Sequence, residues 1–373
     1  MQSLTFCFNK CEGLWLGSWR GRVDKPVPIL WSSVKIKVLG VFLDNDDLNE
    51  LNWRPRIEAV KRCLDSWRSR HLSYNGKALV MNALALSRVW YVASLIPMPS
   101  WVLNELNSLV FNFFWSGKRD LVARNVLVHH RDAGGFSVVS VQFKVTSLLA
   151  QWVRRFVFSP NGWVSLLTYW FFGRFGVRPR DVFADPFAFS PEVLPPFYAS
   201  LLKSWRALLG SSSSSGLVVG SSASAIIRAD SLSTKSCYQL LLLLNPCRPH
   251  CTTKFYPRFG DLDWATTWKS LFFMPFDHHV IDLNWKVAHG VLYTAIGSFL
   301  LVIPFRLLAS AALPSSRLTT FSSPVLWPKV VLIGYNHSCS PFPLWPPPSS
   351  SVICFLDSTM MSCSVSPEFS PTY

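Results

Sequence analysis

The sequence predicts a mainly helical protein with a small β-hairpin near its N-terminus and a disordered C-terminal tail. Short runs of branched and aromatic residues, which are typical of strands, dominate the first 50 residues. Beyond them, apolar residues recur at three- and four-residue steps, as on one face of a helix. The segment 301–373 is mostly serine, proline and scattered apolar residues without a sustained period, so we expect no packed structure there.

The strands are predicted at Gly13–Gly17 and Ile36–Leu43, with a loop rich in glycine and proline between them. Gly40 lies inside the second run. A glycine within a strand indicates a bulge or the close approach of another backbone.

Three helices with short connections are predicted over 51–120 and should form a small antiparallel bundle. The first begins near Asn52, the second spans Lys77–Ile96, and the third spans Ser100–Trp115 with Ser100 as its N-cap. The apolar positions that define the first two helices are Ile57, Val60, Leu64, Trp67, Leu79, Leu84, Leu86 and Val89.

A second hairpin is predicted over 125–139, and a serine- and glycine-rich linker over 211–230. Helices are predicted on both sides of the linker, including Gln142–Phe158 and Pro196–Leu209. The predicted division of the chain is therefore 1–50, 51–120, 121–210, 211–230, 231–300 and 301–373.

Charge is scarce but strongly biased. Only 15% of the residues are charged, yet 36 Lys and Arg outnumber 21 Asp and Glu, a net charge of +15. Residues 1–180 hold 24 basic and 11 acidic residues, whereas 296–373 hold three and two. Such a bias favours contact with a polyanion such as RNA or DNA, and the 50% apolar content excludes a wholly disordered chain.

The candidate nucleic-acid contacts are cations interleaved with tryptophans around the predicted strands and first helix. Cations neutralise phosphates and release counterions, and aromatic rings stack on unpaired bases. An ordinary solvated basic face beside core tryptophans is the alternative. The candidates are Arg20, Arg22, Lys35, Lys37, Arg54, Lys61, Arg62, Arg68, Arg70 and Lys77.

No catalytic or metal site is expected, and no cofactor or small-molecule substrate. Asp44, Asp46 and Asp47 follow a strand, where turn and N-cap roles are commoner than metal binding. Cys247 and Cys251, with His250 between them, form only one of the two close pairs that a structural zinc site needs.

The nine cysteines are an odd, widely spaced set, which favours free thiols in a reducing compartment, nuclear or cytoplasmic. The uncharged stretches 156–173 and 290–305 are interrupted by proline, so we expect no membrane span.

An ordered set of short motifs resembles the polymerase of non-LTR (LINE-type) retrotransposons, over most of 10–210 and 262–292. The motifs are Lys10–Gly17, Arg20–Arg22, Trp31–Ser33, Lys35–Leu43, Asn52-Trp53, Leu64–Trp67, Leu72–Lys77, Phe113–Trp115, Arg131–Gly135, Leu194–Tyr198 with Trp205, Trp264, Trp268 and Asp282–Gly290.

The resemblance begins just after that family's catalytic Asp-Asp motif. It implies that Val38, Leu39, Gly40, Val41, Phe42 and Leu43 correspond to the primer grip, a palm remnant, and 51–120 to the thumb. The later segments resemble the region that normally leads into a Cys/His zinc knuckle. That pattern stops after Gly290, and Cys339, Cys354 and Cys363 do not reproduce it.

The expected function is that of a remnant of an RNA-directed DNA polymerase without its catalytic centre, which is no enzyme by itself and binds RNA or DNA non-specifically. Two-metal phosphoryl transfer needs positioned carboxylates, and the resemblance supplies none here. The alternatives are a subunit that pairs with a separate catalytic chain, and a non-catalytic helical module for protein or membrane association.

Overall fold

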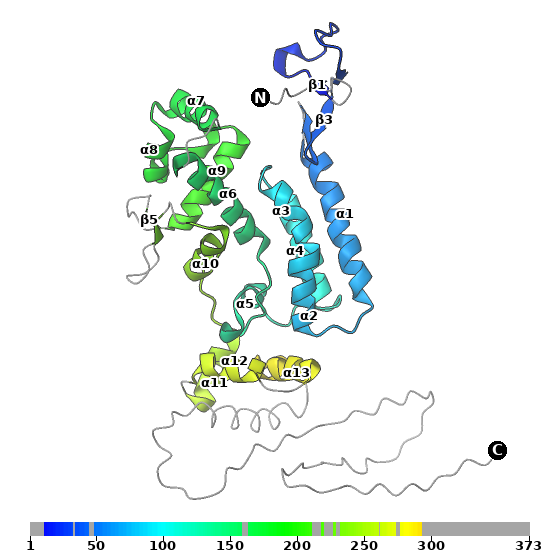
Figure 1. Ribbon diagram of the computed structural model, residues 1–373. Coiled ribbons are helices and arrows are strands. Elements are labelled where there is room, and N and C mark those ends of the chain that lie inside the picture. Colours follow the sequence, from blue (N-terminus) through cyan, green and yellow to red (C-terminus); the bar gives the residue numbers. More distant parts are fainter. Residues whose placement is uncertain are drawn as a thin grey trace, which may run out of the picture. The chain divides into compact units, whose positions relative to one another are not determined.

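The computed structural model describes residues 11–32, 34–44, 48–158, 163–210, 218–219, 227–228, 232–260, 262–273 and 277–292. All of them belong to one compact unit, residues 1–305. The protein is mainly helical with a small β-hairpin near its N-terminus, as predicted (Figure 1). The predicted tail 301–373 and most of the predicted linker 211–230 lie outside the described residues.

The N-terminal strands form two separate pairs. Strand β1 (Glu12–Leu14) pairs in parallel with β2 (Leu30–Ser32), and β3 (Lys35–Val38) pairs antiparallel with β4 (Val41–Asp44). The single strand predicted over 36–43 is therefore wrong. The chain reverses at Leu39 and Gly40, which both have positive φ (48° and 82°), as a two-residue hairpin turn requires.

Two side chains of the first helix, α1 (Leu48–Arg68), hold the β3–β4 hairpin. The buried Asn52 amide accepts from the Phe42 N–H (2.8 Å) and donates to the Phe42 carbonyl (3.0 Å). Arg56 donates to the Gly40 carbonyl at 3.1 Å. The Phe42 N–H and carbonyl point away from β3, and the Asn52 amide gives them the two hydrogen bonds that a neighbouring strand would otherwise provide.

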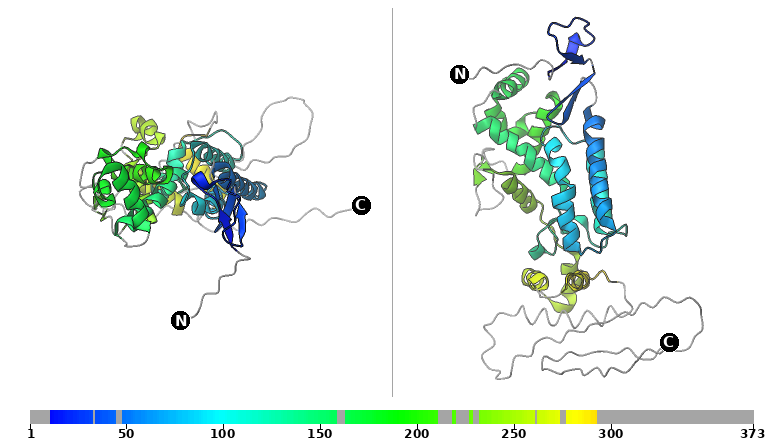
Figure 2. Two further views of the ribbon diagram at one scale, coloured as in Figure 1. Left: turned by 90° about the horizontal axis from the view of Figure 1, so that it is seen from above. Right: turned by 45° about the vertical axis from the view of Figure 1, so that its right-hand side comes forward.

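The predicted bundle is present, with α1 packed against α3 (Ser87–Ala93) and α4 (Ser100–Phe114), and these three helices lie side by side in both figures (Figures 1 and 2). The apolar spacing of α1 buries Trp53, Ile57, Val60 and Leu64 in its core. Pro99, not Ser100, precedes the first turn of α4, and no side chain caps that end.

The second predicted helix is interrupted by a π-helical turn, η3 (Val80–Ala85), between α2 (Tyr74–Leu79) and α3. The helical segment begins at Tyr74, three residues earlier than predicted, because the Ser73 hydroxyl caps the Gly76 N–H. Leu79 and Leu86 would share one face of a regular helix. The wider turn rotates those faces apart, and Leu86 is buried while Leu79 is exposed.

The hairpin predicted over 125–139 is wrong. That region forms a short helix, α5 (Arg124–Val128), a 3-10 turn, η4 (Arg131–Ala133), and an irregular stretch whose N–H groups at 136–138 donate to the carbonyls of Leu127 and His129. Asn82, in the π-helical turn, also binds this stretch. Its side chain donates to the Ser137 carbonyl and accepts from the Val139 N–H, both at 2.9 Å.

A second group of helices follows the bundle. The core of the group contains Trp205, whose indole N–H donates to the Phe183 carbonyl at 3.0 Å. Its elements are α6 (Val141–Phe158), α7 (Trp163–Phe175), α8 (Pro179–Ala184), η5 (Pro186–Ala188), η6 (Pro191–Val193) and α9 (Pro196–Leu209). The helices predicted over 142–158 and 196–209 are confirmed within a residue.

The chain after 211–230 returns to the same core. Two short strands, β5 (Val218–Val219) and β6 (Ile227–Arg228), precede α10 (Thr234–Leu244), which packs on α6 and α9. Three helices follow, α11 (His250–Phe259), α12 (Trp264–Phe273) and α13 (His278–Ala288). One apolar cluster runs from Val41 to Ala288, so the predicted segments 1–50, 51–120, 121–210 and 231–300 share a core. The boundaries between these segments remain a prediction.

Replacing Asn52 by Ala should lower the free energy of unfolding by about 2 kcal/mol, because two hydrogen bonds are removed and two backbone groups are left without their partner. Urea denaturation measures this decrease, and hydrogen exchange at the Phe42 amide should accelerate. Asn112→Ala, at an exposed position of α4, is the control. Equal exchange at Phe42 in the parent and Asn52→Ala would show that the amide does not hold the hairpin.

Candidate nucleic-acid interface

The predicted cations lie in four different settings. Lys35 and Lys37 are exposed on β3 and flank the ring of Phe42, with each Nζ 5.3–5.4 Å from its centroid. Both ammonium groups are therefore oriented by one ring on the hairpin. They stay open to solvent.

The arginines near β1 lie beside the tryptophans that motivated the prediction. Trp15 and Trp31 stack at 4.2 Å between ring centroids, and the Arg22 guanidinium lies 4.7 Å from the Trp19 ring. Arg22 also forms an ion pair with Asp24. Arg20 is exposed in the same turn.

On α1 the predicted basic face also carries acids. Arg54 pairs with Glu50 at 2.8 Å and Glu105 at 3.4 Å, and Arg68 pairs with Asp65 at 3.3 Å. All of these groups are well exposed. Two of the predicted phosphate contacts on this helix therefore already have carboxylate partners.

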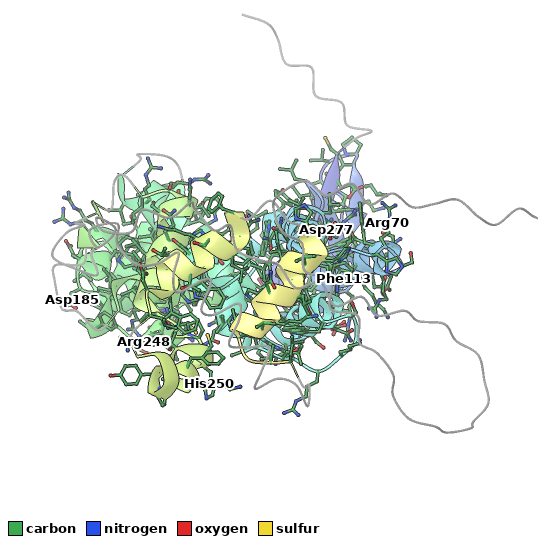
Figure 3. The ribbon with its side chains drawn as sticks, turned by 90° about the horizontal axis from the view of Figure 1, so that it is seen from below. Arg70, Phe113, Asp185, Arg248, His250 and Asp277 are labelled. Carbon is green, nitrogen blue, oxygen red and sulfur yellow. The ribbon has the colours of Figure 1, made fainter. Side chains whose placement is uncertain are left out.

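Three other cations of this face have no carboxylate within 4.0 Å among the residues that the structure describes. Lys61 and Arg62 project into solvent from the middle of α1. Arg70 follows the end of the helix, where its guanidinium lies 4.1 Å from the centroid of Trp67, which is half-buried (Figure 3).

Lys77 lies apart from that face. It is half-buried, and its Nζ donates to the Phe114 carbonyl at 2.9 Å and to the Ser116 hydroxyl at 2.6 Å. Burial lowers the pKa of the amine. Lys77 ties α2 to the end of α4, which is a structural role.

Lys77 belongs to a polar cluster that sequence reasoning missed. Asp282 of α13 accepts from the Tyr74 N–H at 2.8 Å, and burial raises the pKa of its carboxyl. Lys286 lies over the Tyr74 ring at 5.0 Å, and burial lowers the pKa of its amine. Lys118 acts electrostatically on both lysines. The amines of Lys77 and Lys286 thus act on one carboxylate, and Lys118 adds a third positive charge near these two amines.

Two of the motifs that carry the resemblance, Arg131–Gly135 and Asp282–Gly290, meet in the core. The Trp285 indole N–H donates to the Gly134 carbonyl at 2.8 Å, and His289 Nε2 lies 3.1 Å from the same oxygen. The Trp268 ring packs beneath Gly134, where an added Cβ would come within 2.8 Å of it, and the φ of +82° also favours glycine.

His289 is buried between Trp268 (4.8 Å between ring centroids) and Trp285 (4.4 Å). Burial lowers its pKa to about 4. Its Nδ1 lies 3.8 Å from the Cys251 thiol, whose pKa burial raises to about 12. Both groups are therefore neutral at pH 7, and they form a packed contact without a reactive thiolate.

The residues that resemble the primer grip divide by exposure. Val41 is buried against the bundle, whereas Leu39 at the turn is 84% exposed, and Val38 and Leu43 are also exposed. The hairpin thus presents an apolar tip flanked by two lysines.

Among the described residues, no three His, Cys, Asp or Glu side chains gather as a metal site would require. The described cysteines, including Cys247 and Cys251 of the zinc hypothesis, are free thiols. Asp46 and Asp47 lie outside the described residues. Within the part of the chain that the structure covers, no helix is both long and apolar enough to cross a membrane.

The fold and these surfaces define a mainly helical protein with cationic sites on its hairpin, its first helix and its C-terminal helices. No family model matches the chain. It is similar to the transposon TX1 uncharacterized 149 kDa protein of Xenopus laevis, with 28% identity over 213 residues. That match covers 53% of this chain and 16% of the relative, and it links the chain to a transposon protein.

The burial of His289 predicts a pH-dependent stability. Its folded pKa of about 4 lies below the ordinary 6.5, so its contribution is complete above pH 6.5 and disappears as the pH falls toward 4. The free energy of unfolding, from urea denaturation across this range, should fall by about 3 kcal/mol through this group. His289→Gln should remove this part of the pH dependence of the free energy of unfolding, and His279→Gln, at an exposed position, should retain it. An unchanged pH dependence of the free energy of unfolding in His289→Gln would contradict the burial argument.

Proposed function

We propose that this chain is part of a non-LTR (LINE-type) retrotransposon reverse transcriptase, from the region that follows the catalytic aspartates. We further propose that it binds RNA or DNA through the phosphate backbone without sequence preference. The carrying observation is the set of exposed cations on the β3–β4 hairpin and α1. The similarity to a transposon protein and the ordered motifs support the family assignment.

The ion pairs on α1 do not oppose this function. Exposed pairs such as those of Arg54 and Arg68 contribute about 0–1 kcal/mol each, because water screens them. A phosphate can replace the carboxylate at little cost. No ion pair with a described residue has to be broken before Lys61, Arg62 or Arg70 can bind a phosphate.

Sequence preference is not expected, because the cations are flexible side chains on the outside of one helix and one hairpin. Base readout uses side chains that reach base edges in a groove, whereas phosphate contacts orient the partner without reading it. The hairpin is fixed on α1 by Asn52 and Arg56, so its lysines keep a fixed place relative to that helix.

A catalytic role for the described part is not proposed. The Arg131–Gly135 and Asp282–Gly290 motifs have a packing explanation, since Gly134, Trp285 and His289 meet in the core. An exposed apolar stripe on α7, formed by Leu166, Tyr169 and Phe172, favours the second candidate, a helical module that binds another protein.

Replacing Lys61, Arg62, Arg68 and Arg70 together by Gln should weaken the binding of RNA and DNA of any sequence. Counterion release gives a log–log salt slope of about −0.7 to −0.9 per phosphate bound by a cation, so the slope should flatten by that amount for each phosphate that the variant no longer neutralises. Fluorescence anisotropy of the full chain against a salt series measures both quantities.

The matched control replaces Arg174, Arg178, Arg180 and Lys203 by Gln, which removes the same charge from α7, the loop after it, α8 and α9. It should change binding little. Equal weakening by both variants would indicate general attraction by net charge, and no weakening by the α1 variant would leave the protein-binding candidate.

The full chain should show no template-dependent nucleotide incorporation with Mg²⁺ or Mn²⁺, because the resemblance supplies no metal-binding carboxylate pair. A primer-extension assay measures this directly. Extension above the level without protein, abolished by Asp46→Asn or Asp47→Asn, would show that these aspartates hold metal.

A further inference from the structure

A hollow of about 460 Å³ lies between the η4 turn and the end of α12, away from the hairpin and α1. None of the residues that line it was singled out as a binding residue by the sequence. Its volume is within the 300–1,000 Å³ that is common for sites binding small ligands. Figure 3 shows the α12 and α13 end of the protein from below, with Asp277 at the start of α13.

The walls of the hollow are fixed by the core beneath it. The η4 turn leads into Gly134, whose carbonyl accepts from Trp285 and His289. On the opposite wall, Phe272 packs edge-on against the buried Phe136, with 5.4 Å between the ring centroids. A site with such walls needs little ordering when a ligand enters, which favours binding.

The lining is cationic. Arg131 donates to the Asn75 side-chain oxygen, and among the described residues neither Arg131 nor Lys269 lies within 4.0 Å of a carboxylate. Ser137 and His130, 3.3 Å apart, add polar groups, and Asp132 is the acidic lining residue. Two cations against one carboxylate favour an anion, and a guanidinium and a hydroxyl are ordinary phosphate donors.

The other part of the lining is aromatic and open. Phe273 is 86% exposed, the largest exposure of any described aromatic residue, and Phe272 next to it is half-buried with Arg131 5.7 Å from its centroid. The exposed Phe273 ring has an open face beside two cations, so a ligand with an aromatic ring and an anionic group can contact both. A base stacks on such a ring regardless of its identity.

We propose that this hollow binds an unpaired nucleotide of a single strand, with its phosphate at Arg131 and Lys269 and its base on Phe273. A blunt duplex offers no unstacked base for that ring, so the site selects single-stranded over paired nucleic acid. This inference deepens the proposed function and rests on it in one respect, since the cations of α1 bring the strand to the protein by binding its backbone.

The test compares a fluorescent 12-nucleotide single strand with a blunt duplex in anisotropy measurements on the full chain. The Lys269→Gln/Phe273→Ala variant should bind the single strand about tenfold more weakly, because one base-stacking ring and one phosphate-binding cation are removed, and should bind the duplex nearly as the parent does. Tyr169→Ala/Lys235→Gln is the matched control, since it removes an exposed aromatic ring and an exposed lysine elsewhere.

The outcomes separate the two proposals. Unchanged single-strand affinity in the Lys269/Phe273 variant, or equal weakening for both ligands, overturns the hollow as a site for an unpaired nucleotide. If either of these results is found while the four-Gln variant of α1 binds nucleic acid more weakly than the parent, the proposed function stands without the hollow. If the four-Gln variant binds normally and the Lys269/Phe273 variant no longer binds the single strand, the hollow stands and the α1 surface fails. A nucleoside monophosphate that competes for the single strand supports the hollow, and a parent that binds neither ligand overturns both.

Discussion

The carbonyl oxygen of Gly134 joins the last helices to the rest of the fold. It accepts from the Trp285 indole and from His289, and its glycine leaves room for the Trp268 ring below. A buried carbonyl with two donors is strongly held, because breaking either bond strands a polar group in the core. This contact, the bond between Asp282 and Tyr74, and the packing of the Phe272 and Trp285 rings on Phe136 attach α12 and α13. The lysine cluster and the hollow beside η4 exist because these helices are held there.

The positive charge of the chain is divided by what each cation contacts. Burial makes Lys77 and Lys286 part of the structure, carboxylates engage Arg54 and Arg68, and Lys61 and Arg62 face solvent. Net charge therefore does not by itself identify a binding surface. Exposed cations without a carboxylate partner among the described residues are better candidates, and they include Lys61 and Arg62 on α1, Lys35 and Lys37 on the hairpin, and Lys269 beside η4.

The helices could be predicted from the sequence because each buries one apolar face, a pattern that repeats at 3.6 residues. The predicted span of α9 agrees with the structure, and that of α6 agrees within a residue. The hairpin prediction over 125–139 failed because its first half forms the short helix α5, and the N–H groups of 136–138 donate to carbonyls at the end of that helix. The two bonds to the side chain of Asn82, a residue 55 positions before Ser137, are encoded by no local pattern. The π-helical turn was not predicted either, because one extra residue per turn leaves the composition of the segment unchanged.

The candidate site was predictable only in part. Clustering of basic residues with tryptophans identified the cations of the hairpin and α1. Lys269 and Phe273 were missed because the fold brings Arg131 and Ser137, which lie more than 130 positions earlier in the sequence, to the same hollow. The adjacency of Lys286 and Lys77 depends likewise on the bond between Asp282 and Tyr74. The Asp282–Gly290 motif contained the signal for Lys286, but its role required the packing of α13.

The packing of α10 on α6 and α9 bears on the order of synthesis. When α9 has left the ribosome, the apolar faces that α10 will cover are complete but open, and they stay so until the serine- and glycine-rich stretch has also been translated. A nascent chain at that stage offers chaperones a defined surface. The same geometry means that a protease cut in that stretch would not by itself release the C-terminal helices, since the two pieces are held by a shared core and not by the covalent link.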